Sequence, residues 1–65
     1  MGQQEAFKIP PAGRVVRLGN VLDRHLYRID VGGGWHIEVD ANSSSQAASI
    51  ATRERYEVRG VNKIA

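Results

Sequence analysis

Two stretches near the middle of the chain alternate apolar and polar residues with a period of two. The first is LYRIDV, residues 26–31, and the second is WHIEVD, residues 35–40. Successive side chains on a β-strand point to opposite faces, so this pattern predicts two strands that each have one apolar face. Three glycines, residues 32–34, separate the two stretches. The segment therefore predicts a β-hairpin with a three-residue loop.

A three-residue loop fixes which residues face each other across this hairpin. The apolar side then consists of three facing pairs: Ile29 with Ile37, Tyr27 with Val39, and Val31 with Trp35. The polar side consists of two pairs of complementary groups: Arg28 with Glu38, and Asp30 with His36. A register shifted by one residue would mix the two faces. We interpret the glycines as turn residues with positive φ, because a phosphate-binding loop would lead into a helix instead of a strand.

The polar face of the second predicted strand carries the pattern His36, Glu38 and Asp40. An imidazole and two carboxylates are groups that bind divalent metals or transfer protons. Same-face side chains on a strand are about 7 Å apart, however, and Arg28 and Asp30 face two of the three. The pattern therefore favours a solvated charged face, and we expect no metal, no cofactor and no catalytic residue.

The rest of the chain predicts four further elements and an arm. The stretch 13–22 reads as a first strand bent at Gly19. Ser43 followed three residues later by Gln46 fits a capping box and predicts a helix over 43–53. Its apolar face comprises three residues: Ala47, Ile50 and Ala51. Residues 55–60 predict a fourth strand, residues 61–65 a short final strand or tail, and residues 1–11, ending in two prolines, a flexible N-terminal arm.

The chain has 65 residues and no cysteine. It is long enough for one domain with a small core, and no disulfide or thiolate metal site supports that core. We therefore expect support from self-association or from a protein partner. The formal net charge of +2 is too small to indicate a polyanionic partner by itself. The sequence has no signal-peptide pattern and no segment of membrane-spanning length, which predicts a soluble cytoplasmic protein without a membrane partner.

Arginine is the strongest positive feature, since its guanidinium suits bidentate phosphate contacts. Five arginines on the predicted first strand, and on or near the fourth, are candidate nucleic-acid contacts: Arg14, Arg17, Arg53, Arg55 and Arg59. Glutamates are interleaved among them, which is typical of a solvated strand face. Proteins that bind single strands also stack bases on exposed aromatic residues. Of the aromatic residues, we expect Tyr27, Trp35 and Tyr56 to be buried and only Phe7 to be free.

The order of three strands, one helix and two strands predicts a mainly β fold. We expect residues 12–65 to form a five-stranded OB-like barrel with one short helix between strands 3 and 4. An SH3-like barrel is the alternative, because it too uses short hairpins and a bent strand. The connections between strands are short, so we expect no small-molecule substrate.

The stretch from Gly13 to Gly60 also resembles a group of very short bacterial proteins of unknown function with an OB-like barrel. The resemblance depends on five features: Gly13 with Val15, Tyr27, the glycine turn before Trp35, the run YEVRG at 56–60, and Ile64. Such proteins commonly have a leucine and then a glycine before the fourth strand, where this chain has Ile50 and then ATRER. The resemblance implies no activity, and OB-folds in general suggest oligonucleotide, oligosaccharide or protein binding.

Two functional hypotheses follow from the sequence. The first is a non-catalytic protein-interaction or assembly module, because the core is small and an extended arm and strand edges are available for pairing. The second is weak, largely sequence-independent nucleic-acid binding through the five arginines. Neither histidine has a nucleophile near it in sequence, so we do not expect an enzyme.

Overall fold

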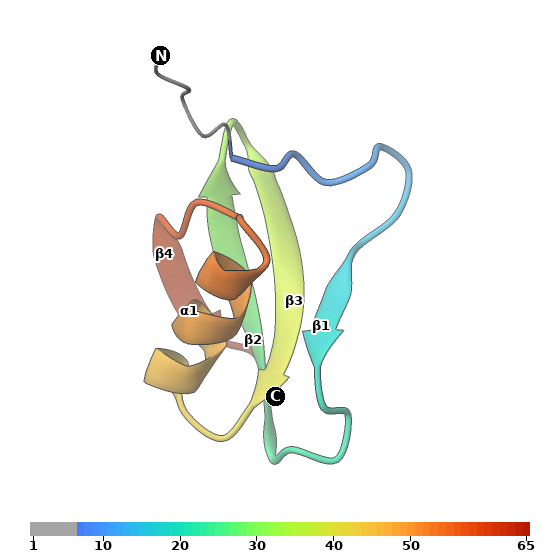
Figure 1. Cartoon of the computed structure of the whole chain (residues 1–65). Coiled ribbons are helices and arrows are strands. Elements are labelled where there is room, and N and C mark those ends of the chain that lie inside the picture. Colours follow the sequence, from blue (N-terminus) through green and yellow to red (C-terminus); the bar gives the residue numbers. More distant parts are fainter. Residues whose placement is uncertain (1–6) are drawn as a thin grey trace.

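A computed structural model describes residues 7–65 of the chain (Figure 1). Over these residues it has four strands and one helix: β1 (Arg17–Gly19), β2 (His25–Gly32), β3 (Trp35–Ala41), α1 (Ser44–Arg53) and β4 (Gly60–Lys63). The strands form one mixed sheet in the order β1-β3-β2-β4, and α1 covers one of its faces. The part of the predicted arm that comprises residues 1–6 lies outside the described residues.

The central hairpin confirms most of the predicted register. Residues on β2 and β3 pair in the order expected at four positions: Tyr27 with Val39, Arg28 with Glu38, Ile29 with Ile37, and Asp30 with His36. The predicted pair of Val31 and Trp35 is wrong, because a bulge between Asp30 and Gly32 places Gly32 opposite Trp35. The loop therefore has two residues, Gly33 and Gly34, whose φ values of 64° and 82° fit a type I′ turn.

The core lies between the sheet and α1. The apolar face of the hairpin contributes Tyr27, Ile29, Val31, Ile37, Val39 and Ala41, all of which are buried. The helix faces them with Ala47 and Ala51, which are fully buried, and with the half-buried Ile50. Alanine is small, so α1 lies close to the sheet. The predicted apolar face of the helix is confirmed.

Both ends of α1 have defined capping contacts. At the start, Oγ of Ser43 accepts a hydrogen bond from the backbone N–H of Gln46 at 3.1 Å, as the capping pattern predicts. At the end, Arg55 has a left-handed φ of 71°. Its N–H donates to the carbonyl of Thr52 at 2.9 Å, and the N–H of Tyr56 donates to that of Ala51 at 3.0 Å. These two bonds form a Schellman motif.

The predicted five-stranded barrel is wrong, and so is the SH3-like alternative, because the sheet is open. Strand β1 pairs in parallel with β3, and β4 pairs with β2, so β1 and β4 are the two edges. Because α1 already covers the apolar face of the sheet, the sheet need not close into a barrel to bury that face. The mainly β class is correct.

Gly19 shows why β1 takes this unexpected place. Its φ is 87°, and a Cβ atom there would collide with the carbonyl oxygen of Asp40. The chain therefore passes against the backbone at the end of β3 before it turns back to begin β2. Only glycine permits both the conformation and the close approach. The predicted bend of a ten-residue strand at Gly19 is wrong, because β1 has three residues and ends at Gly19.

The predicted fourth strand over residues 55–60 is also wrong. Residues 55 and 56 complete the Schellman motif of α1, so their backbone N–H groups donate to carbonyls of the helix. Strand β4 begins at Gly60 and ends at Lys63, which combines the end of one predicted strand with most of the next. Its partner β2 runs in the opposite direction. In chain order, β3, α1 and β4 form a β-α-β crossover. The strands β3 and β4 are parallel to each other, and β2 lies between them in the sheet.

Candidate functional site

Trp35 is the largest exposed aromatic group near the glycine turn, with 41% of its surface accessible. It pairs with Gly32, which has no side chain to pack against the indole. Its ring lies against Gly33, since a Cβ atom at that glycine would be 3.2 Å from Cδ1 of the tryptophan. The sequence places this tryptophan in the core, and that prediction is wrong. The indole of Trp35 is left partly exposed because its neighbours Gly32 and Gly33 have no side chains to cover it.

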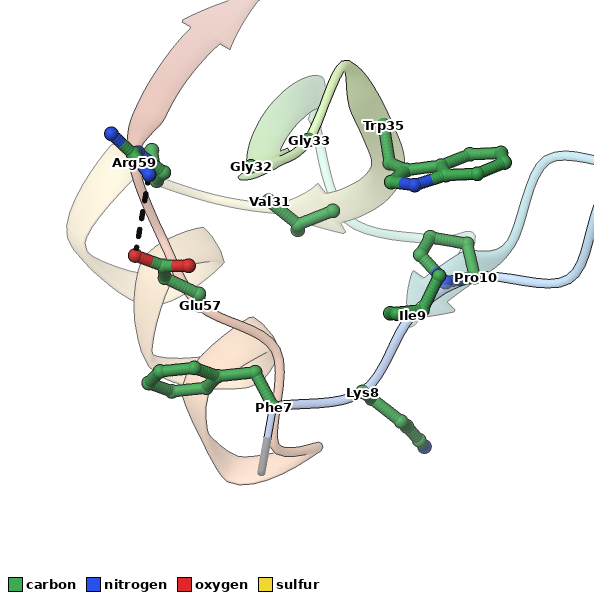
Figure 2. Close-up of a pocket in the computed structure, with 10 residues that line it drawn as sticks. All are labelled: Phe7, Lys8, Ile9, Pro10, Val31, Gly32, Gly33, Trp35, Glu57 and Arg59. Carbon is green, nitrogen blue, oxygen red and sulfur yellow. Dashed lines mark ion pairs between the residues drawn. The ribbon is translucent and has the colours of Figure 1, made fainter. Parts of the chain in front are cut away.

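A first hollow lies on one side of the Trp35 ring (Figure 2). It has a volume of about 270 Å³, and residues from three separate segments line it: Phe7, Lys8, Ile9, Pro10, Val31, Gly32, Gly33, Trp35, Glu57 and Arg59. Figure 2 shows Ile9 and Pro10 on one side of the hollow, Val31 in its middle and the ion pair of Glu57 and Arg59 at its rim. The nitrogen and oxygen of that ion pair are 3.7 Å apart. The hollow is thus apolar inside and charged at its edge.

A second hollow, of about 290 Å³, lies on the other side of Trp35. It is lined by Pro10, Pro11, Gly13, Arg14, Val15, Gly34, Trp35 and His36. The two hollows share Trp35 and Pro10 in their linings. We call five apolar residues that line the two hollows the Trp35 surface: the exposed Phe7, Ile9, Val15 and Trp35, and the buried Pro10.

The segment before β1 is held in place by Lys8. Its N–H donates to the carbonyl of Arg55 at 2.9 Å, and its Nζ lies 5.0 Å from the centre of the Tyr56 ring. The same ammonium group is 3.8 Å from Oε1 of Glu54. Pro10, two residues later, is buried, whereas Phe7 and Ile9 are 60% and 68% exposed. Lys8 and Pro10 therefore anchor the segment, and Phe7 and Ile9 add exposed apolar side chains to the lining of the first hollow.

The structure does not gather the five candidate arginines at one place. Arg14 and Arg59 line the two hollows beside Trp35. Arg53 lies on α1, where it lines a shallow depression with Ala48, Ser49 and Thr52. Arg55 ends the helix, and its carbonyl accepts the hydrogen bond from Lys8. Arg17, on β1, is on the face of the sheet that α1 does not cover.

Arg17 forms a bidentate ion pair with Asp40. Its Nε donates to Oδ2 at 2.7 Å and its Nη2 donates to Oδ1 at 2.8 Å. Asp40 is only 4% exposed, so the expectation that it belongs to a solvated face is wrong. The hydrogen bonds from Arg17 lower the pKa of Asp40 against the opposing effect of burial, and the same bonds raise the pKa of Arg17. The pair joins β1 to the end of β3.

Neither a metal centre nor a membrane-spanning helix is found in residues 7–65. No three His, Asp or Glu side chains gather closely enough there to hold a metal ion. The single helix of this part is too short and too polar to cross a bilayer. His36 is exposed beside the second hollow, and His25 packs edge-on against Tyr27.

Comparisons with family models, with curated proteins and with solved structures find no match to this chain. The resemblance to very short bacterial proteins therefore stays a prediction, and the OB-like barrel that it implies is wrong. The Trp35 surface is the site that reasoning from the sequence missed. The preference of hairpins for two-residue type I′ turns was a usable signal, because a turn at Gly33 and Gly34 leaves Trp35 opposite a glycine.

Proposed function

We propose that this protein is a non-catalytic protein-interaction or assembly module and that it docks partners on the Trp35 surface. The observation that carries this proposal is the exposed tryptophan between two adjoining hollows, next to the exposed side chains of Phe7 and Ile9. The expected cytoplasmic location belongs to the same proposal.

The dimensions and chemistry of the surface support a protein partner. Sites for small molecules usually enclose about 300–1,000 Å³ and surround most of the ligand. The two hollows here, at about 270 and 290 Å³, lie at the lower limit of this range, and both are open to solvent. Protein interfaces concentrate their binding energy in a few residues, in which tryptophan and arginine are enriched. Trp35 with Arg14 and Arg59 around it has that composition.

Site-specific photo-crosslinking in cells tests the proposal. Phe7, at the rim of the first hollow, is replaced by p-benzoyl-phenylalanine in the full chain. The control places the same group at Ser49, an exposed position on α1. We expect discrete protein adducts at position 7 that are absent at position 49 and that Trp35→Ala abolishes. Equal adducts at both positions, or adducts that persist in Trp35→Ala, would contradict the proposal.

A second candidate function is weak nucleic-acid binding, and a specific observation favours it. The exposed ring of Trp35 lies between Arg14 and Arg59, and single-strand binders combine an aromatic platform with basic groups in this way. Glu57 at the rim and the ion pair of Arg17 with Asp40 reduce the positive charge available to phosphates. Fluorescence anisotropy with a labelled mixed-sequence single strand tests this function. If the protein has this function, the strand binds, the binding weakens steeply as salt is added, and Trp35→Ala abolishes it.

A further inference from the structure

The end of the sheet opposite Trp35 carries a second apolar feature. The connection from β1 to β2 forms a turn over Asn20–Asp23, and its two central residues are Val21 and Leu22. They are 71% and 85% exposed, the highest values among the large hydrophobic residues described. We call this feature the Val21–Leu22 turn. Turn tips usually carry glycine or polar residues, so two aliphatic side chains there need an explanation.

The Val21–Leu22 turn is held by defined hydrogen bonds. The N–H of Asp23 donates to the carbonyl of Asn20 at 2.8 Å, and the N–H of Leu22 donates to Oδ1 of Asn20 at 2.9 Å. A turn held in this way loses little conformational freedom when it binds, so less of its interaction energy is lost to ordering. The two side chains project from the end of the molecule as a preformed apolar knob.

The knob and the Trp35 surface lie at opposite ends of the sheet. In Figure 1, β2 runs from the end that holds the β1–β2 connection to the end that holds the glycine turn and the start of β3. One end thus projects aliphatic side chains, and the other has an apolar hollow whose middle is Val31 and whose wall is Trp35. Surfaces of this kind on opposite ends of one molecule allow copies to associate head to tail.

Charges next to the two features are complementary. Asp23 and Arg24 follow the knob directly in the sequence. The rim of the first hollow carries Arg59 and Glu57, which pair with each other at 3.7 Å. An acidic and a basic group beside the knob can therefore meet groups of opposite sign at the rim of the next copy. Such rim pairs select orientation more than they add affinity.

We propose that copies of this chain associate head to tail, with the Val21–Leu22 turn of one copy seated in the first hollow beside Trp35 of the next. This inference rests on the proposed function and names a second copy of the chain as the partner. An open assembly keeps a free knob at one end and a free hollow at the other until it closes into a ring. Each contact in this mode joins two unlike ends, which distinguishes it from a two-fold symmetric dimer.

Mixing two variants tests this arrangement directly. Leu22→Asp destroys the knob and leaves the hollow, while Trp35→Ala destroys the wall of the hollow and leaves the knob. Masses are measured by sedimentation equilibrium over a hundredfold concentration range, and circular dichroism verifies folding. We expect the unaltered protein to form dimers and larger species, each variant alone to be monomeric, and an equimolar mixture to form a complex of two chains and no more. Ser49→Asp, on the exposed side of α1, is the control and should leave the assembly unchanged.

Several outcomes would overturn the proposal. These are a monomeric unaltered protein over the whole range, a variant that assembles alone, or a mixture that stays monomeric although both variants are folded. If Trp35→Ala does not fold, Ile9→Asp replaces it, because Ile9 is 68% exposed in the wall of the same hollow. A monomeric protein whose position 7 still crosslinks to a different protein would refute head-to-tail association and leave the proposed function standing. A monomer without adducts at position 7 would refute both.

Discussion

Gly19 is the residue on which the placement of β1 depends. Its φ is positive, and its backbone lies against the carbonyl of Asp40. A residue with a side chain would be strained at this φ and would collide with that carbonyl. We predict that Gly19→Ala lowers the free energy of unfolding by at least about 1–3 kcal/mol, which is the usual strain of such a backbone conformation. Thermal denaturation measures this effect. Gly13→Ala is the matched control, because Gly13 has the same φ of 87° and no atom within 4 Å of the new methyl group. Equal losses in the two variants would show that the contact with Asp40 contributes nothing.

Asp40 should make stability depend on acid pH. Its pKa is lowered in the folded protein by the hydrogen bonds from Arg17, while the unfolded chain has the ordinary value of about 3.9. The unfolded state therefore binds more protons just below that value, and stability must fall as the pH falls. The contribution is complete above about pH 4 and is lost as the pH drops through the lower folded pKa.

The measurement is the melting temperature between pH 2 and pH 7 for the unaltered protein and for Asp40→Asn. Asparagine keeps the shape of the side chain and cannot titrate. We expect the variant to melt at a lower temperature at neutral pH and to lose less stability in acid. Parallel curves for the two proteins would exclude Asp40 as the source of the acid sensitivity.

At the scale of elements, the C-terminal end of α1 holds one residue in a strained backbone conformation that a substitution can relieve. Arg55 occupies the left-handed position of the Schellman motif, where glycine is usual. We predict that Arg55→Gly is more stable than Arg55→Ala by about 0.5–1 kcal/mol, because both variants lose the arginine side chain and the left-handed penalty of about 1–2 kcal/mol exceeds the entropic cost of a glycine. The melting temperature of Arg55→Gly should be higher than that of Arg55→Ala by about 2–8 °C for a domain of this size. Arg53→Gly, inside the last turn of the helix, should lower the melting temperature of the protein. A loss in Arg55→Gly relative to the unaltered protein would mean that side-chain contacts of Arg55 outweigh the strain.

The elements that the sequence predicts well are those specified by local patterns. The register of β2 and β3 follows from alternation on two faces, and the helix follows from Ser43 and the spacing of Ala47 and Ala51. The placement of β1 is not local, because it depends on a contact between Gly19 and Asp40 that are far apart in the sequence. Residues 55–60 contain strand-forming side chains, yet the helix end uses the backbone of Arg55 and Tyr56. A tertiary contact overrode the local preference at β1, and a capping contact did so at residues 55 and 56.

The candidate site was missed for a related reason. The alternating pattern assigns Trp35 to the apolar side of β3, which is correct for Ile37 and Val39. Alternation does not indicate where the covering layer stops, and Trp35 lies at the end of its strand beside glycines. Its exposure also depends on where Ile9 and Pro10 lie, and their positions follow from contacts that Lys8 makes with the end of α1. Such contacts between distant segments leave no periodic signal.

At the scale of the whole molecule, the exposed large hydrophobic residues of the described part gather at its two ends. Phe7, Ile9, Val15 and Trp35 surround the hollows at the glycine turn. At the opposite end, Val21 and Leu22 project from the turn, and the exposed Ile64 pairs with Leu26 at the start of β2. Contiguous exposed apolar surface usually marks an interaction site. A domain this small also has little core, so covering both ends would stabilise it.

Trp35 is the only tryptophan of the chain, so its own fluorescence reports whether this surface is covered. The first measurement is therefore the emission spectrum of the unaltered protein across a dilution series, with the molecular mass determined on the same samples. We predict that the mass rises with concentration and that the emission maximum moves to shorter wavelength over the same range, because association removes water from the indole. A constant monomer mass, or a mass that rises while the emission stays unchanged, would contradict head-to-tail assembly through the Trp35 surface.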